Sequence, residues 1–179
     1  FLDIRSYTEI AETLGHIQYF ELLNDFFRDI AEPIAKNGGQ IYQYVGDEVV
    51  LTWPVEEDAI NLNCLNFFFA FKDRLNKQNE KYEEEFGFVP KFKAGLHSGK
   101  ITVAEVGDIK REIAYHGDTI NTAARIQKMC NKFDKDFISS LSIKNLFDRN
   151  IQYEFNFLDK TILQGKTEKI KLFSVSEKV

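Results

Sequence analysis

The chain has 179 residues, of which 44% are hydrophobic and 28% charged, and its formal net charge is −5 at pH 7. This composition is typical of a soluble globular protein, and the length predicts one domain over residues 1–179. The negative charge argues against a nucleic-acid partner, which needs clustered Lys and Arg, and no apolar run is long enough to span a bilayer.

The start of the chain predicts a strand followed by a long helix. Phe1–Ile4 reads as a buried strand, and its abrupt apolar opening without an initiator Met suggests a piece cut from a longer polypeptide. A hydroxyl-bearing turn then leads into a helix that ends at the Asn-Gly-Gly of 37–39. Apolar residues recur three or four positions apart along this helix, at Ile10, Leu14, Ile17, Leu23, Phe27, Ile30 and Ile34.

The middle of the chain predicts two hairpins, each turning at a Gly-Asp pair, with a helix and a half-buried strand between them. Both cysteines fall in helical contexts without metal-ligand spacing, so they read as reduced core residues. The expected elements are strands 40–45 and 48–53, a helix from about 57 to 81, a strand over 91–96, and strands 101–106 and 112–116.

The last third predicts two further helices and the strands that close the sheet. These are a helix over 119–132, a short strand at 137–138, a brief helix over 143–147, and strands around 153–157 and 170–175. The order of elements predicts an α+β sandwich with a ferredoxin-like βαββαβ core. Its sheet is expected to be mostly antiparallel, with helices on one face and additional C-terminal strands.

Two aspartates stand out by their positions. Asp3 lies within a hydrophobic strand, where an ionised carboxylate is costly unless it has a partner or a metal. Asp47 follows Gly46 at the tip of a tight hairpin. If that hairpin lies beside the first strand, the carboxylates meet at one edge of the sheet, where they suit Mg²⁺ together with substrate phosphates. The alternative is that Asp3 is a helix-entry acid and Asp47 an ordinary turn residue.

The segment from Ile4 to Thr8 is a second candidate binding element. A strand that runs directly into a helix start presents backbone N–H groups and the positive end of the helix dipole, which together favour an anion. An anion site next to a metal site is what a metal–triphosphate requires. Many helices begin in this way without binding a ligand.

The most specific motif lies at residues 116–125, where Gly117-Asp118-Thr119 is followed by Asn121 and Arg125, four residues apart and on one helix face. With the segments Phe1–Thr8 and Val45–Glu48, this motif resembles the class III adenylyl/guanylyl cyclase catalytic domain. The resemblance covers nearly the whole chain, and the three segments agree in order and spacing.

The resemblance implies a role for each matching residue in the metal and phosphate sites. Asp3 and Asp47 would hold two ions per site, Mg²⁺ or Mn²⁺, and Ile4 would lend its carbonyl. The family has Gly where Ser6 stands here, a difference that the backbone should tolerate. The backbone amides that would hold the β- and γ-phosphates belong to Ile4, Arg5, Ser6, Tyr7 and Thr8.

The resemblance also implies the chemistry and the residues that assist it. The ribose 3′-oxygen would attack the α-phosphorus in line and release pyrophosphate, giving a 3′,5′-cyclic nucleotide. Asn121 would orient the ribose, and Arg125 would stabilise charge on the α-phosphorus. Lys166 matches a lysine that contacts the triphosphate, and Lys100 matches a basic position that assists there. His97 and His116 are expected to be structural.

Base choice rests on two positions. Lys91, at the position where adenylyl cyclases carry a lysine, can donate to adenine N1, which favours ATP and cyclic AMP. Ala114 occupies the second base-reading position and cannot accept a hydrogen bond from the adenine amine through its side chain, although a backbone carbonyl could substitute. Guanylate cyclase activity, relaxed specificity and a plain surface role for Lys91 therefore stay open.

Family sites are composite, because the aspartates come from one subunit and Asn121, Arg125 and the lysines from the other. The resemblance thus implies a head-to-tail homodimer, with the hairpin 101–116 as a dimerisation arm or an ordinary sheet edge. It also implies a cytoplasmic domain, in a chain that can be membrane-anchored, driven by an upstream sensor or membrane module. The rival readings are a diguanylate cyclase and a non-catalytic cyclase-like regulatory module.

Overall fold

The computed structural model describes residues 1–55, 62–149, 151–165 and 167–178. The chain divides into two compact units. The N-terminal unit comprises Leu2–Phe92, and the C-terminal unit comprises Lys93–Val179 together with Phe1.

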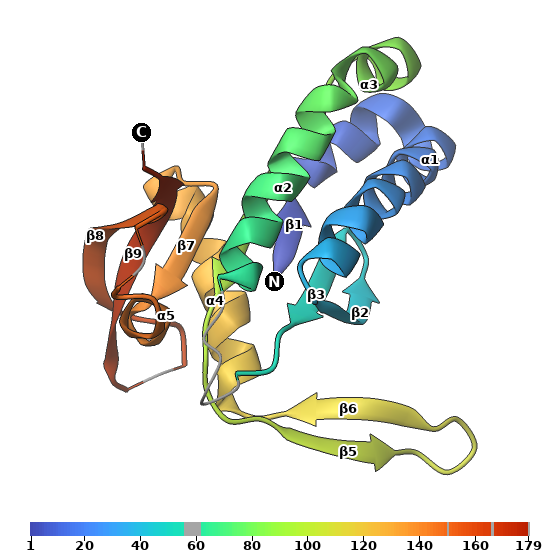
Figure 1. Ribbon diagram of the computed structural model, residues 1–179. Coiled ribbons are helices and arrows are strands. Elements are labelled where there is room, and N and C mark those ends of the chain that lie inside the picture. The colour runs from blue at the N-terminus through green and yellow to red at the C-terminus, as the bar shows by residue number, and fades with distance from the viewer. Residues whose placement is uncertain (56–61, 150, 166, 179) are drawn as a thin grey trace. The chain divides into compact units, whose positions relative to one another are not determined.

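The N-terminal unit packs helices against a small antiparallel sheet (Figure 1). The strand order within it is β2-β3-β1, and both pairings are antiparallel. Its core consists of buried aliphatic and phenylalanine side chains from the strands and from α1 and α2, among them Ile4, Phe26 and Phe71. The elements are β1 (Leu2–Ile4), α1 (Tyr7–Lys36), β2 (Gln40–Val45), β3 (Glu48–Thr52), α2 (Asn63–Lys77) and α3 (Asn79–Phe86).

Helix α1 is broken near its start, which the apolar periodicity did not predict. Gly15 has φ 74 and ψ 166, so two helical segments meet there. Glycine adopts this conformation without the steric cost that a Cβ would add. The expected apolar stripe fails at the same place: Ile17 is 78% exposed, whereas Leu22 and Phe26 further along the helix are fully buried.

The helix expected over 57–81 is also not a single helix. Residues 56–61 lie outside the described part, so the start of that prediction is not tested. The described part forms α2 and α3, which meet at Gln78 with φ −100 and ψ 11. Asn76 and Asn79, on either side of this junction, favour a helix less strongly than alanine or leucine does. Helix α3 ends at Gly87 in the left-handed conformation.

A buried polar network joins the three helices of this unit. Asp29 on α1 is 6% exposed and accepts hydrogen bonds from the Tyr82 hydroxyl (3.0 Å) and from Arg74 Nε (3.0 Å). Arg74 also bonds to Glu32 on α1 at 3.0 Å. Burial, together with the Asp29 carboxylate, raises the pKa of Tyr82. The phenol therefore stays protonated and remains a hydrogen-bond donor to Asp29.

Tyr82→Phe is expected to lower the free energy of unfolding by about 1–3 kcal/mol, because it leaves the buried Asp29 carboxylate with one donor fewer. Urea unfolding followed by circular dichroism measures the change. Tyr115→Phe, on a strand of the C-terminal unit, serves as a control for loss of a less buried phenol hydroxyl and should cost much less. Equal losses in the two variants would contradict the network's role.

The C-terminal unit contains a second sheet and a separate two-stranded ribbon. The sheet has the order β4-β7-β9-β8, in which β4 and β7 are parallel and the other pairs antiparallel. The mixed α+β class with a mostly antiparallel sheet is thus confirmed. The elements are β4 (Phe92–Leu96), β5 (Thr102–Val106), β6 (Glu112–His116), α4 (Asp118–Phe133), β7 (Phe137–Ser140), α5 (Leu141–Leu146), β8 (Tyr153–Ile162) and β9 (Lys169–Glu177).

Strand β4 is buried on both faces, whereas alternation of Phe and Lys predicted a half-buried strand. Lys93 is 7% exposed, and its ammonium donates to Asn131 Oδ1 on α4 at 3.1 Å. The face expected to meet solvent is therefore covered by α4. A lysine is tolerated there because its stem packs along the helix while its charged end finds an acceptor.

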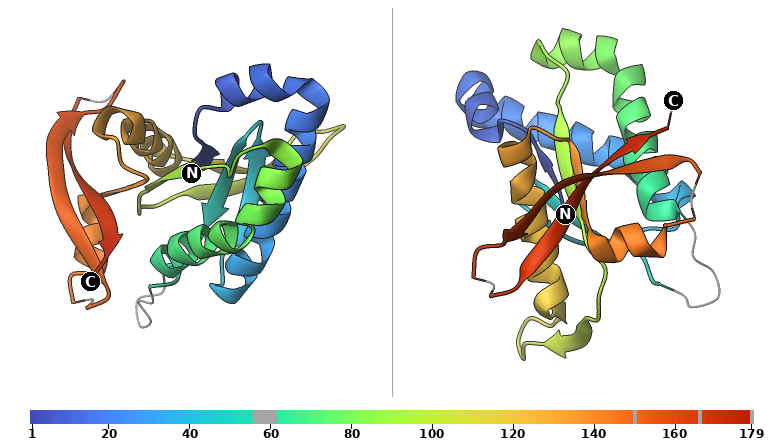
Figure 2. Two further views of the ribbon diagram at one scale, coloured as in Figure 1. Left: turned by 90° about the horizontal axis from the view of Figure 1, so that it is seen from above. Right: turned by 90° about the vertical axis from the view of Figure 1, so that its left-hand side faces the viewer.

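Helix α4 lies along one face of the sheet of β7, β9 and β8 (Figure 2). Cys130 donates to the carbonyl oxygen of Ala94 in β4 at 3.3 Å, which ties the helix to that strand as well. Both cysteines are free, as expected. The core between helix and sheet consists of Ile126, Cys130, Ile138, Leu163 and Leu172.

Candidate functional site

The first half of the candidate site is a pair of carboxyl groups in the N-terminal unit. Asp3 is the middle residue of β1, and its Cα lies opposite Glu48 in the antiparallel register with β3. Asp47 directly precedes Glu48 in the β2–β3 turn, where Gly46 has a positive φ of 64. The strand pairing therefore brings the two aspartates together, as the sequence predicted, and their carboxyl groups are close enough to affect each other's ionisation.

The environment of this pair suits a bound cation. Asp47 Oδ2 is buried and has no hydrogen-bond partner among the described residues, and Asp3 Oδ1 is buried as well. Burial, followed by the side-chain interaction with Asp3 and its negative charge, raises the pKa of Asp47 to about 7. A buried, underbonded carboxylate oxygen next to a second carboxylate is costly without a positive charge. The donor set fits Mg²⁺ or Mn²⁺, which take one or two carboxylates plus substrate phosphates.

Tyr19 on α1 belongs to the same neighbourhood, although nothing in the sequence pointed to it. Burial raises its pKa to about 12, and the charges of Asp47 and Asp3 act in the same direction. The phenol is thus close enough to the carboxylates to feel their field. Tyr19 follows the break at Gly15, so its position depends on a bend that the periodicity did not indicate.

The turn between β1 and α1 has the geometry of a strand that leads directly into a helix. Ser6 adopts the left-handed conformation (φ 56, ψ 32), which explains why a glycine is suited to this position, and its side chain does not cap the helix. The amide of Arg5 donates to the carbonyl of Lys91 at 2.8 Å. That donor is thus already used in this conformation, and the expected contact of the Arg5 amide with phosphate stays a prediction. The amides at the start of α1 keep the helix-terminus geometry expected of an anion site.

The second half of the candidate site lies in the C-terminal unit on α4. Asn121 is exposed and Arg125 is half-buried, one turn apart on the same helix. The described part of the chain provides no ion-pair partner for the Arg125 guanidinium. The planar N–H donors of a guanidinium suit the oxygens of an anion such as a phosphate.

Close glycine contacts set the position of α4. A Cβ added at Gly95 would lie 2.2 Å from the backbone nitrogen of Gln127, so the strand and helix backbones touch there. A Cβ at Gly99 would lie 2.5 Å from Thr119 Oγ1, and that hydroxyl donates to the carbonyl of Lys100 at 2.7 Å. Lys100 thus anchors the start of α4 through its backbone.

The predicted base-reading residues lie in different units. Lys91 is exposed in the N-terminal unit just before β4, and Ala114 lies on β6 opposite Ala104. Lys166 lies outside the described residues. His97 Nδ1 is within 2.8 Å of Ser140 Oγ, in keeping with a structural role.

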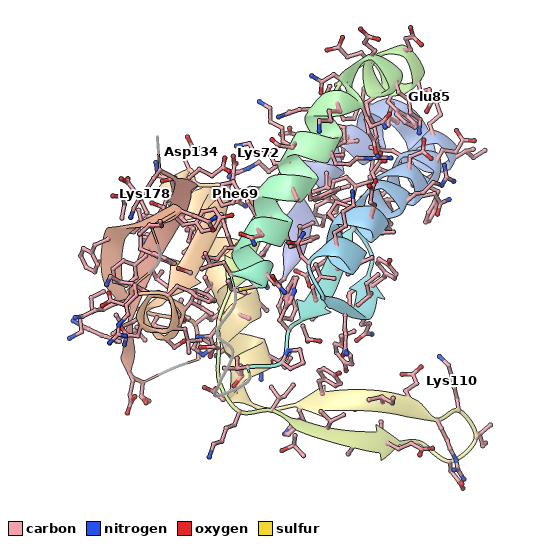
Figure 3. All side chains as sticks on the ribbon, in the orientation of Figure 1. Phe69, Lys72, Glu85, Lys110, Asp134 and Lys178 are labelled. Carbon is pink, nitrogen blue, oxygen red and sulfur yellow. The ribbon has the colours of Figure 1, made fainter. Side chains whose placement is uncertain are left out.

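The β5–β6 ribbon extends away from α4, as Figure 1 shows, and Lys110 is at its tip (Figure 3). Its strands pair only with each other among the described residues. Every residue of β5 is exposed. Large apolar side chains on the ribbon and its tip have no cover within the unit: Val103, Val106, Ile109 and Ile113.

The described residues contain neither a cluster of three or more His, Cys, Asp and Glu side chains nor a helix long and apolar enough to cross a membrane. The pair of Asp3 and Asp47 is smaller than such a cluster. Two carboxylates are sufficient for a cation that also binds substrate phosphates.

Comparisons with known proteins found relatives of this chain both in sequence and in structure. The chain is 29% identical over 176 residues to adenylate cyclase 2 of Rhizobium meliloti, covering 98% of this chain and 48% of that protein. The adenylyl cyclase CyaB of P. aeruginosa has a similar structure, with a TM-score of 0.85 at 18% identity over 99% of this chain and 92% of the other.

The guanylate cyclase domain of RhGC from Catenaria anguillulae, solved in complex with GTP, aligns with a TM-score of 0.80 at 19% identity, covering 99% of this chain and 94% of that one. These structural likenesses show the fold. The chain spans about half the length of the Rhizobium relative. The family model described as the adenylate and guanylate cyclase catalytic domain matches residues 1–177, so the chain belongs to that family.

Proposed function

We propose that the two units act as a single catalytic domain that converts ATP into 3′,5′-cyclic AMP and pyrophosphate. The observation that carries the proposal is the carboxyl pair of Asp3 and Asp47, whose burial and mutual repulsion favour a bound cation. The membership of the chain in the cyclase family and the adenylate cyclase relative support the reaction class.

Asp3 and Asp47, with the carbonyl of Ile4, would hold the Mg²⁺ or Mn²⁺ ions at the end of β1. When bound, such ions activate the ribose 3′-oxygen and neutralise the leaving pyrophosphate. The residues of the chain bind and orient the nucleotide around them. The first amides of α1 and the positive end of its dipole would receive the β- and γ-phosphates, next to the carboxyl pair.

On α4, Arg125 would stabilise the charge that develops on the α-phosphoryl oxygens, and Asn121 would orient the ribose. The guanidinium is suited to this role because it stays charged and matches phosphate oxygens with two parallel N–H groups. Lys100 and Lys166 would add positive charge near the triphosphate.

The proposed base is adenine. Lys91 is exposed, so its ammonium can reach a ligand, and it would donate to adenine N1. Ala114 offers no side-chain acceptor to the exocyclic amine, so discrimination against GTP is expected to be modest. A site that leaves a polar edge of its ligand unread selects weakly between bases.

The direct test is incubation of the purified domain with ATP, GTP, CTP and UTP in parallel with Mn²⁺, followed by chromatographic identification of the product. Cyclic AMP as the main product supports the proposal. Cyclic GMP, formed from GTP, as the main product would overturn the choice of base. Dinucleotide product would indicate a diguanylate cyclase. Nucleotide binding without turnover would indicate a regulatory module.

We also propose that the site is shared between two copies of the chain, with the aspartates from one and Asn121 and Arg125 from the other. The exposed apolar side chains of the β5–β6 ribbon support an interface of this kind, since such surfaces are usually covered in an assembly. In a two-fold dimer each copy contributes both halves, so two equivalent sites form.

Mixing two inactive variants is expected to restore activity. Asp47→Asn and Arg125→Ala should each be inactive alone, but a mixed dimer combines an intact aspartate half with an intact α4 half at one of its two sites. Random mixing at equal concentrations gives about a quarter of wild-type activity. Activity should also rise faster than linearly with protein concentration at high dilution. If mixing restores nothing although the variants exchange subunits, both halves of each site come from the same copy.

A further inference from the structure

The turn after β8 lies against the guanidinium of Arg125. Gly165 in this turn has φ 70, and a Cβ added to it would lie 3.2 Å from Arg125 Nη2 and 3.8 Å from Arg125 Cζ. A contact of 3.2 Å is closer than a methyl group and a guanidinium nitrogen normally approach. A side chain at position 165 would therefore crowd the guanidinium, and the turn passes this close to Arg125 because residue 165 has none.

This contact bears on the direction of the Arg125 side chain. The residues that the structure describes include no carboxylate that pairs with it. Neighbouring Leu163 is 2% exposed and lies in the same core as Ile126, the residue after Arg125. The turn is thus attached to the part of the unit on which α4 rests.

We infer that Gly165 is a positioning residue for Arg125: it lets the turn after β8 support the guanidinium from one side and keeps it directed toward the substrate. This inference rests on the proposed role of Arg125 and extends it to a second segment of the chain. A side chain at position 165 would displace the guanidinium from the place where it meets the phosphate. Misplacing a catalytic group by about 1 Å can slow a reaction by about 100-fold.

A matched control separates this contact from backbone strain. Gly165→Ala introduces both a Cβ next to Arg125 and an alanine at positive φ. Gly87, which ends α3, has a similar φ of 79 but nothing within 4 Å of an added Cβ. Gly87→Ala therefore introduces comparable strain without touching Arg125.

The kinetic test compares the two variants as purified full chains with ATP and Mn²⁺. Gly165→Ala is expected to lower kcat by on the order of 10-fold to 100-fold with little change in KM, whereas Gly87→Ala should stay within about twofold of wild type. In an Arg125→Lys background, Gly165→Ala should have little further effect, because the displaced group is no longer present. An equal loss in both backgrounds would overturn the inference, since the turn would then act through another residue.

A second measurement does not depend on turnover. The Nε–Hε resonance of Arg125, assigned in a ¹⁵N–¹H spectrum by its loss in Arg125→Lys, should shift in Gly165→Ala and not in Gly87→Ala. If the resonance stays in place in both variants, the turn does not position the guanidinium. If it shifts as expected while the wild-type domain forms no cyclic nucleotide, the positioning holds and the proposed function fails. Melting temperatures of both variants, measured alongside, test whether they remain folded.

Discussion

Asp47→Asn is expected to reduce cyclic nucleotide formation by on the order of 1000-fold, because it removes a negatively charged ligand from the proposed cation site. Asparagine has nearly the same shape as aspartate, so the turn that Gly46 and Asp47 form should survive. The measurement is the rate of product formation with Mn²⁺ at saturating ATP. Titration of Mn²⁺ against the protein without nucleotide should show weaker binding in the variant.

The same substitution is expected to raise the thermal stability of the metal-free domain at alkaline pH. Burial, together with the contributions of Asp3, raises the pKa of Asp47 to about 7, well above its usual range. Its folded form therefore holds a proton more tightly than its unfolded form. The stabilisation that this proton gives the folded domain is fully present below the pKa of Asp47 in the unfolded state. It is lost as the pH rises through the pKa of Asp47 in the folded state. Asparagine cannot ionise, so the melting temperature of the variant should match that of wild type at about pH 4 and exceed it above about pH 7.

Asp108→Asn supplies the control, because Asp108 follows Gly107 in the other hairpin turn but is exposed. It should alter neither the pH dependence of the melting temperature nor metal binding. Saturating Mg²⁺ or Mn²⁺ should stabilise wild type at pH 8 and leave Asp47→Asn nearly unaffected. A variant that is less stable than wild type at every pH, with or without metal, would mean that Asp47 is a structural turn residue.

Strands and hairpins could be predicted from the sequence because their signals are local. Alternating apolar residues and Gly-Asp turns indicated β2, β3, β5 and β6 with nearly the observed bounds. The break in α1 was not predictable in the same way. Gly15 lies within an apolar pattern that continues on both sides of it, and only the packing of the later part of α1 decides which face is buried.

In the candidate site, too, the parts set by local signals could be predicted and the parts set by distant contacts could not. The meeting of Asp3 and Asp47 was predictable because antiparallel pairing of adjacent segments brings a strand residue next to a turn residue. The places of Tyr19 and Gly165 depend on contacts between segments far apart in the chain, which no spacing rule encodes. The burial of Lys93 was missed for the same reason, since the covering helix begins 25 residues later, at Asp118.

Gly95→Ala is expected to destabilise the domain by about 3 kcal/mol or more and to abolish turnover even where the protein remains folded. An added Cβ would lie 2.2 Å from Gln127 N, 2.6 Å from Gln127 Cα and 2.8 Å from the carbonyl oxygen of Ala123. These are backbone atoms, so no side-chain rotation relieves the clash and α4 must move as a whole. Asn121 and Arg125 would move with it, away from the positions that the reaction requires.

Because the added Cβ clashes with backbone atoms, no second substitution that only removes a side chain should rescue the variant. Gln127→Ala should not restore Gly95→Ala, because the backbone nitrogen and Cα of residue 127 remain. Gly39→Ala offers the contrast: its added Cβ would lie 2.8 Å from the Trp53 side chain, so Trp53→Leu should relieve it. Urea unfolding of the two pairs of single and double variants measures both couplings. Rescue of Gly95→Ala by Gln127→Ala would show that α4 does not rest on β4 through its backbone, and the position of Arg125 would then need another explanation.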